Sequence, residues 1–88
     1  MPDYSVTFAR SARKELEKLP PTIAGRILGK IENLAIAPRP HGSLKLQGEK
    51  NLWRIRIGDY RVVYEIHDDK KSIDVAIVRH RKDVYRDS

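Results

Sequence analysis

Residues 53–57 and 60–66 carry apolar side chains at every second position (Trp53, Ile55 and Ile57, then Val62, Tyr64 and Ile66), and Gly58-Asp59 separates the two runs. This period is typical of β-strands that bury one face, and Gly-Asp at the break favours a tight hairpin turn. A further alternating run, residues 73–78, follows a second polar turn, and Ile73, Val75 and Ile77 are predicted to share its apolar face. The pattern therefore predicts three consecutive antiparallel strands at residues 52–57, 60–66 and 73–78.

The first half of the chain has a different periodicity. Residues 4–8 alternate and predict a short strand, whereas residues 9–19 and 22–35 carry apolar side chains at helical spacing. Pro20-Pro21 separates the two helices, because proline ends one helix and is tolerated in the first turn of the next. Gly25 and Gly29 share a face of the second helix and indicate either a tolerated weakness or close contact with the first helix.

Together these elements predict an α+β fold in the order β-α-α-β-β-β. An antiparallel helical hairpin should cover the apolar face of the three-stranded meander, and residues 37–43 should form the connecting loop. The pattern leaves open which edge of the sheet the first strand joins. With only 88 residues, we expect residues 1–88 to form one domain.

The net charge of the chain limits the classes of partner that it is expected to bind. The chain has 18 Lys and Arg against 12 Asp and Glu, a net charge of +6, and this excess favours nucleic acid, an acidic protein or an anionic surface. Cysteine is absent, so disulfides and thiolate chemistry are excluded. Because the sequence has neither a secretory signal pattern nor an apolar run of about 20 residues, we expect a cytoplasmic protein without a membrane span.

Three arginines are predicted to meet on the face of the sheet that the helices leave uncovered. Arg54 and Arg56 are two residues apart on one strand, and the turn at residues 58–59 brings Arg61 across from them. A solvated basic face is the ordinary interpretation of such a pattern. Arginine clusters also hold phosphate groups bidentately, and this second interpretation predicts an anion-binding site.

His41, His67 and His80 show no spacing typical of metal ligands, so we expect no metal site, and His67 is predicted to be solvent-exposed. His80 lies between two arginines, which favour its neutral form, and is either a proton acceptor or an ordinary surface histidine. Tyr85 either anchors the C-terminal segment on the core or stacks on a nucleic-acid base.

The run LKLQGEKNLWRIRIGDYRVVYEI, followed by VRHRKDVYR, resembles the RelE/ParE superfamily of toxins from prokaryotic toxin–antitoxin systems, and is nearer to the RelE branch. The resemblance implies a ribosome-dependent endonuclease that cleaves messenger RNA in the A site, needs no cofactor and is neutralised by a cognate antitoxin. It implies metal-free attack of the ribose 2′-OH on the adjacent phosphate.

The resemblance also implies roles for individual residues. Arg61 and Arg79 would stabilise the charge of the transition state. Arg54 and Arg56 would hold the RNA backbone and orient the sugar, with Arg54 also counted among the catalytic residues. Tyr85 would stack on a base and hold the geometry for attack by the 2′-OH. Further RNA contacts are expected at Lys45 and Arg81. Relatives often have lysines at the two strand positions, but arginine does not release its proton and cannot act as a base. The proton acceptor would then be His80, Tyr85 or a group of the ribosomal RNA.

Two other functions fit the same resemblance. A ParE-like protein would inhibit DNA gyrase by binding, without cleaving nucleic acid. An inactive module would only pair with an antitoxin.

Overall fold

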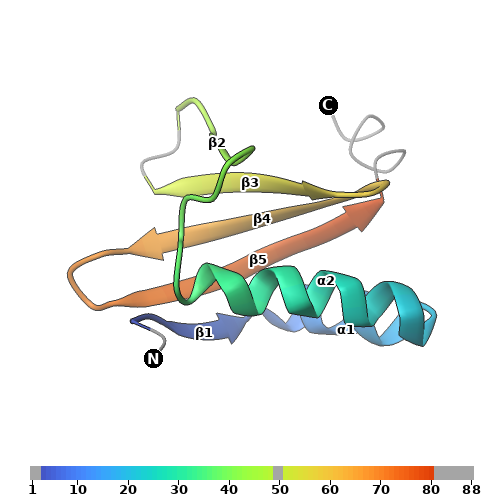
Figure 1. Ribbon diagram of the computed structural model, residues 1–88. Coiled ribbons are helices and arrows are strands. Elements are labelled where there is room, and N and C mark those ends of the chain that lie inside the picture. Colours follow the sequence, from blue (N-terminus) through green and yellow to red (C-terminus); the bar gives the residue numbers. More distant parts are fainter. Residues whose placement is uncertain (1–2, 49–50, 81–88) are drawn as a thin grey trace.

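A computed structural model describes residues 3–48 and 51–80, which form two helices and five strands (Figure 1). The elements are β1 (Ser5–Phe8), α1 (Arg10–Lys18), α2 (Pro21–Leu34), β2 (Leu44–Lys45), β3 (Leu52–Ile57), β4 (Tyr60–His67) and β5 (Ser72–His80). The strands make one sheet in the order β1-β5-β4-β3-β2. The predicted α+β fold, with a helical hairpin and an antiparallel meander, is confirmed. None of the helices in the described ranges is long and apolar enough to cross a membrane.

The sequence pattern did not determine the strand pairing at either edge of the sheet. β1 pairs in parallel with β5, from Ser5 opposite Ser72 to Phe8 opposite Val75. At the other edge, β2 is a two-residue strand antiparallel to β3, which the sequence pattern did not predict. The mixed sheet therefore extends the predicted meander by one strand on each side.

The core lies between the helical hairpin and one face of the sheet. Alternate strand residues, including Ile55, Val62 and Ile73, pack against apolar helix residues such as Leu16 and Ile27. The helices form where predicted, with Pro21 in the first turn of α2. A Cβ atom added at position 25 or 29 would meet no heavy atom within 4 Å, so the proposed close glycine contact between the helices is wrong. The two glycines are tolerated weaknesses of α2.

A β-bulge interrupts the pairing of β4 with β5. Val63 is opposite Ile77, but Tyr64 is opposite Val75, which leaves Ala76 as an extra residue in β5. The alternation of β5 therefore changes phase: Val78 is buried at 2% relative exposure, and Ile77 is exposed at 37%. The prediction that Ile77 shares the core face with Ile73 and Val75 is wrong for this reason. After the bulge, the odd-numbered residues of β5 point to the uncovered face.

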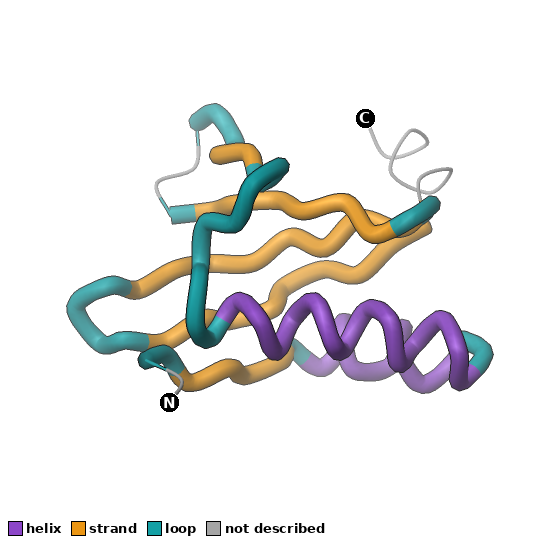
Figure 2. The backbone as a smooth tube through the Cα atoms, viewed as in Figure 1, coloured by secondary structure: helices purple, strands orange, loops and turns teal. Residues whose placement is uncertain are grey.

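Side-chain contacts tie the loop at residues 37–43 to the sheet, and Figure 2 shows this loop running from α2 to β2. The hydroxyl of Tyr64 donates to the carbonyl oxygen of Pro38 at 2.8 Å. Arg39 pairs with Asp68 at 2.7 Å, and its guanidinium lies 5.2 Å from the ring centroid of Trp53. These contacts hold the loop in place without occupying the uncovered face.

Candidate functional site

Arginines from three neighbouring strands lie directly opposite one another on the uncovered face. Arg56 of β3 is the register partner of Arg61 in β4, and Arg61 is the partner of Arg79 in β5. Side chains opposite each other in adjacent strands start about 5 Å apart at their Cβ atoms. Arg54 is two residues before Arg56 and projects from the same face. We call Arg54, Arg56, Arg61 and Arg79 the arginine cluster.

The electrostatics of the cluster show that its members affect one another. Burial lowers the pKa of the Arg54 guanidinium below its ordinary value, and the positive charges of Arg61 and Arg56 lower it further. Within residues 3–48 and 51–80, no carboxylate forms an ion pair with Arg54, Arg56 or Arg61. Like charges placed directly opposite repel, so the register partners Arg56 and Arg61 favour an anion bound between them.

One donor of the cluster is already buried. The Nε–H group of Arg61 is shielded from solvent and has no hydrogen-bond acceptor among the residues that the structure describes. A buried donor without a partner typically costs about 1–3 kcal/mol. A phosphate over the arginine cluster would supply negative charge to the guanidinium groups, and it would reach the buried Nε–H only if the Arg61 side chain moved. The arrangement is therefore suited to binding a phosphodiester.

The β5 bulge decides which residues join this site. It turns Arg79 to the uncovered face and His80 to the helix side, where the His80 ring meets the ring of Tyr60 edge-on, with centroids 5.2 Å apart. Lys45 is also separated from the cluster, because its register partner is Trp53 on the core side of β3. Arg81 and Tyr85 lie outside the described residues. The structure thus brings together four of the expected residues and sets His80 and Lys45 apart.

The far end of the same face holds a group that sequence spacing missed. His67 was predicted to be exposed, but it is half-buried and contacts Glu65 of β4 and Asp74 of β5. Between this group and the arginine cluster, Val63 and Ile77 are partners in adjacent strands and form an apolar strip. The sequence offered only the parity of Glu65 and His67 as a clue, since Asp74 reaches them through strand pairing.

Comparisons with known proteins agree with this architecture. The family model described as ParE toxin of type II toxin-antitoxin system, parDE, matches residues 6–85. Toxin RelG of Mycobacterium tuberculosis is 32% identical over 84 residues, which cover 94% of this chain and 97% of that toxin. The mRNA interferase toxin RelE of Escherichia coli K12 is 30% identical over 89 residues, covering 97% and 93% of the two chains.

Solved structures match the fold as well. The archaeal RelE–RelB complex from Pyrococcus horikoshii aligns with a TM-score of 0.81 and 31% identity, over 90% of this chain and 96% of that one. The intact E. coli RelBE toxin–antitoxin complex aligns with a TM-score of 0.77 and 29% identity, over 88% and 95%.

The chain has a helical hairpin on a mixed five-stranded sheet, and the family model and solved structures match it over nearly its whole length. These matches assign it to the class of type II toxin–antitoxin toxins. The chain belongs to the ParE toxin family, within the RelE/ParE superfamily that its sequence resembles. The relatives above carry the names RelG and RelE, which agrees with the branch that the resemblance favoured.

Proposed function

We propose that this chain is a toxin that cleaves messenger RNA in the ribosomal A site, with the scissile phosphate bound by the arginine cluster. The observation that carries the proposal is the row Arg56–Arg61–Arg79, three cations in register on three strands. The name of one relative, mRNA interferase toxin RelE, supports an endoribonuclease activity. The flat, open face suits a substrate that is held on its other side by the ribosome.

The proposed reaction is an in-line displacement at phosphorus without a metal. The 2′-oxygen forms a bond to the adjacent phosphorus while the bond from phosphorus to the 5′-oxygen of the next nucleotide breaks. The leaving 5′-oxygen takes a proton from water, so the products are a 2′,3′-cyclic phosphate and a 5′-hydroxyl. Arg61 and Arg79 stabilise the charge that develops on the non-bridging oxygens, a role for which a fixed donor contributes about 10²–10³-fold in rate.

The other members of the site bind and orient the substrate. Arg54 and Arg56 hold the RNA backbone, Arg81 contacts a neighbouring phosphate, and Tyr85 stacks on a base. None of the arginines can accept the 2′-OH proton. Because His80 lies across the sheet from Arg79, we assign proton acceptance to Tyr85 or to a group of the ribosomal RNA.

We also propose that the chain is neutralised by a cognate antitoxin. Several of the similar solved structures are RelE–RelB complexes, which supports a partner of this kind. The net charge of +6 favours a partner with an acidic or amphipathic segment.

The chemistry of the cleaved ends tests the proposed function. Purified toxin is added to ribosomes stalled with a defined codon in the A site, and the message is mapped by primer extension. We expect cuts within that codon that carry 2′,3′-cyclic phosphate and 5′-hydroxyl ends. Intact message would contradict the proposal.

Inhibition of DNA gyrase is the second candidate function, because the matching family model is named for ParE. A gyrase cleavage assay on supercoiled plasmid separates the two functions. Trapped double-strand breaks in the plasmid, together with uncut message on ribosomes, would favour gyrase inhibition. We expect the plasmid to remain unbroken.

A further inference from the structure

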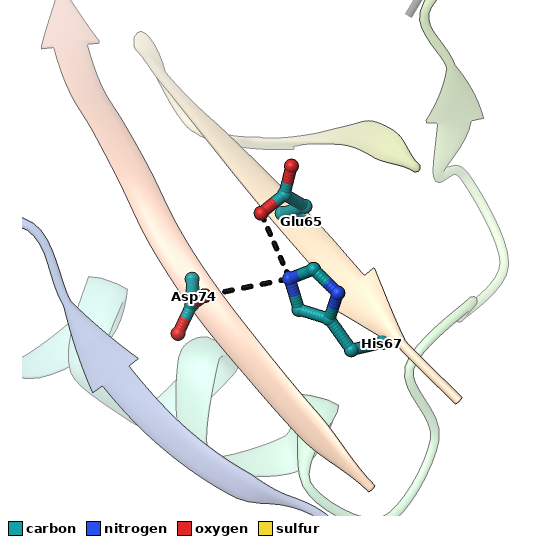
Figure 3. A group of neighbouring side chains, drawn as sticks. All are labelled: Glu65, His67 and Asp74. Carbon is teal, nitrogen blue, oxygen red and sulfur yellow. Dashed lines mark hydrogen bonds and ion pairs between the residues drawn. The ribbon is translucent and has the colours of Figure 1, made fainter. Parts of the chain in front are cut away.

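Three potential metal ligands converge at the end of the uncovered face opposite the arginine cluster. The Nε2 atom of His67 lies 2.8 Å from Oε1 of Glu65 and 3.5 Å from Oδ2 of Asp74 (Figure 3). One ligand atom from each residue lies within 4.8 Å of the other two. All three side chains are partly exposed, so this corner is open to solvent and to ions.

The backbone explains why these groups meet. Glu65 and His67 are two apart in β4 and project from the same face, and Asp74 of β5 is the register partner of Glu65. Two carboxylates directly opposite each other repel, as the arginines do at the other end. A cation between them relieves this repulsion, and the Nε2 atom of His67 lies close enough to both carboxylates to bind the same cation.

We propose that Glu65, His67 and Asp74 form a zinc-binding site. One imidazole nitrogen and two carboxylate oxygens are ordinary Zn²⁺ ligands, with bonds of about 2.0–2.2 Å in a tetrahedral arrangement. Such bonds place ligand atoms about 3.3 Å apart, close to the separations between His67 and the two carboxylates. With His67 neutral, the two carboxylate charges balance the charge of the ion, and the exposed side leaves a position for water.

A neighbouring strand orients one of the ligands. The hydroxyl of Thr7 in β1 donates a hydrogen bond to Oδ1 of Asp74, whereas Oδ2 of the same carboxylate faces His67. Outer contacts of this kind fix the direction of a ligand and commonly change metal affinity by about 10–100-fold. Thr7 is therefore a positioning residue of the proposed site.

The ligand set favours zinc over magnesium, because Mg²⁺ prefers six oxygen ligands and releases its waters reluctantly. The site is separate from the proposed nuclease chemistry. Glu65 is four residues from Arg61 in the same strand, about 13 Å along β4. The proposals of zinc binding and of RNA cleavage can therefore be tested independently of each other.

The test is a calorimetric titration of the full-length, metal-free protein with ZnCl₂, followed by CoCl₂ with visible absorption. We expect one Zn²⁺ per chain and a Co²⁺ spectrum that zinc abolishes. His67→Ala and Glu65→Gln should each weaken zinc binding by about 100-fold or more, and Thr7→Val by about 10-fold. His41→Ala removes a histidine from an exposed loop and should leave the affinity unchanged.

Circular dichroism of each variant separates loss of a ligand from loss of the fold. Glu65→Gln keeps the shape of the side chain and serves if His67→Ala does not fold. The proposal is overturned if the wild-type protein binds no zinc, if Glu65→Gln and His67→Ala bind it as the wild type does, or if His41→Ala abolishes binding. Equal binding of Mg²⁺ would also overturn it, since a bare acidic patch would then explain the result.

Discussion

Tyr64 links the core to the connecting loop through a single hydroxyl. Its side chain is fully buried, and its hydroxyl donates to the carbonyl of Pro38 at 2.8 Å. Burial raises the pKa of this phenol to about 12, from an ordinary value of 10. The folded state therefore holds the phenolic proton more strongly than the unfolded state does.

This shift predicts a pH dependence of stability in alkali. Below pH 10 the phenol is protonated in both states, and its contribution is fully present. Between about pH 10 and 12 only the unfolded state loses the proton, so the free energy of unfolding falls by about 1.4 kcal/mol per pH unit. Urea unfolding of wild type and Tyr64→Phe checks this: the wild type should lose more stability than the variant over this range. Parallel losses in the two proteins would contradict the expectation.

At neutral pH the same substitution tests the hydrogen bond. Tyr64→Phe removes the donor to the Pro38 carbonyl, and we expect a loss of about 1–2 kcal/mol in the free energy of unfolding.

Among the individual elements, β5 has the largest effect on the arginine cluster, because its β-bulge sets the face on which Arg79 lies. The bulge at Ala76 exchanges the faces of Ile77 and Val78 and brings Arg79 opposite Arg61. Without the extra residue, Arg79 would fall on the core side with Ile73 and Val75. Bulges are common beside functional sites, where they redirect a side chain.

Paired threonine substitutions test the phase of β5. Val78→Thr buries a hydroxyl and should lower the free energy of unfolding by about 1–3 kcal/mol. Ile77→Thr changes an exposed position and should alter it by less than about 0.5 kcal/mol. Chemical denaturation of both variants gives the comparison, and a larger loss at Ile77 would mean that the alternation continues through the strand without a bulge.

The elements differ in how far the sequence could predict them. The helices, the meander and the face of Arg54, Arg56 and Arg61 follow from local periodicity, so they could be predicted. The bulge could not, because Ala76, Ile77 and Val78 are all apolar and fit either face, so only pairing with β4 selects the extra residue. The parallel pairing of β1, the two-residue β2 and the contact of Asp74 with His67 depend likewise on strands distant in sequence.

The same limit of prediction applies to Arg79 and His80 at the end of β5, because the bulge decides which face each of them occupies. The family resemblance implied a role for Arg79, and the structure brings Arg79 opposite Arg61, whereas simple alternation would have put it on the core face. His80 was a reasonable candidate by its neighbours in the sequence, yet the bulge turns it to the opposite face.

On the scale of the whole molecule, the uncovered face is divided by charge. The arginine cluster occupies one end, Glu65, His67 and Asp74 the other, and the strip with Val63 and Ile77 lies between them. With a net charge of +6, the chain attracts polyanions over long range. The division directs such a ligand to the arginine end.

RNA binding should therefore depend strongly on salt. If about five cations contact single-stranded phosphates, the logarithm of the binding constant falls with the logarithm of salt concentration at a slope near −3.5. Arg56→Gln should reduce this slope by about 0.7, whereas Arg10→Gln, an equal loss of charge on the helical side, should leave it unchanged. Fluorescence anisotropy with a short RNA measures the slopes, and a flat wild-type response would argue against an RNA-binding face.

The rate of message cleavage by Arg61→Gln, in single turnover on programmed ribosomes, tests the central role of the arginine row most directly. We predict a fall of about 10²–10³-fold relative to wild type, with the variant at least as stable as the wild type because a repulsive charge has been removed. Arg10→Gln, the matched control, should cleave at the wild-type rate. Cleavage by a folded Arg61→Gln protein within a few-fold of wild type would contradict the account.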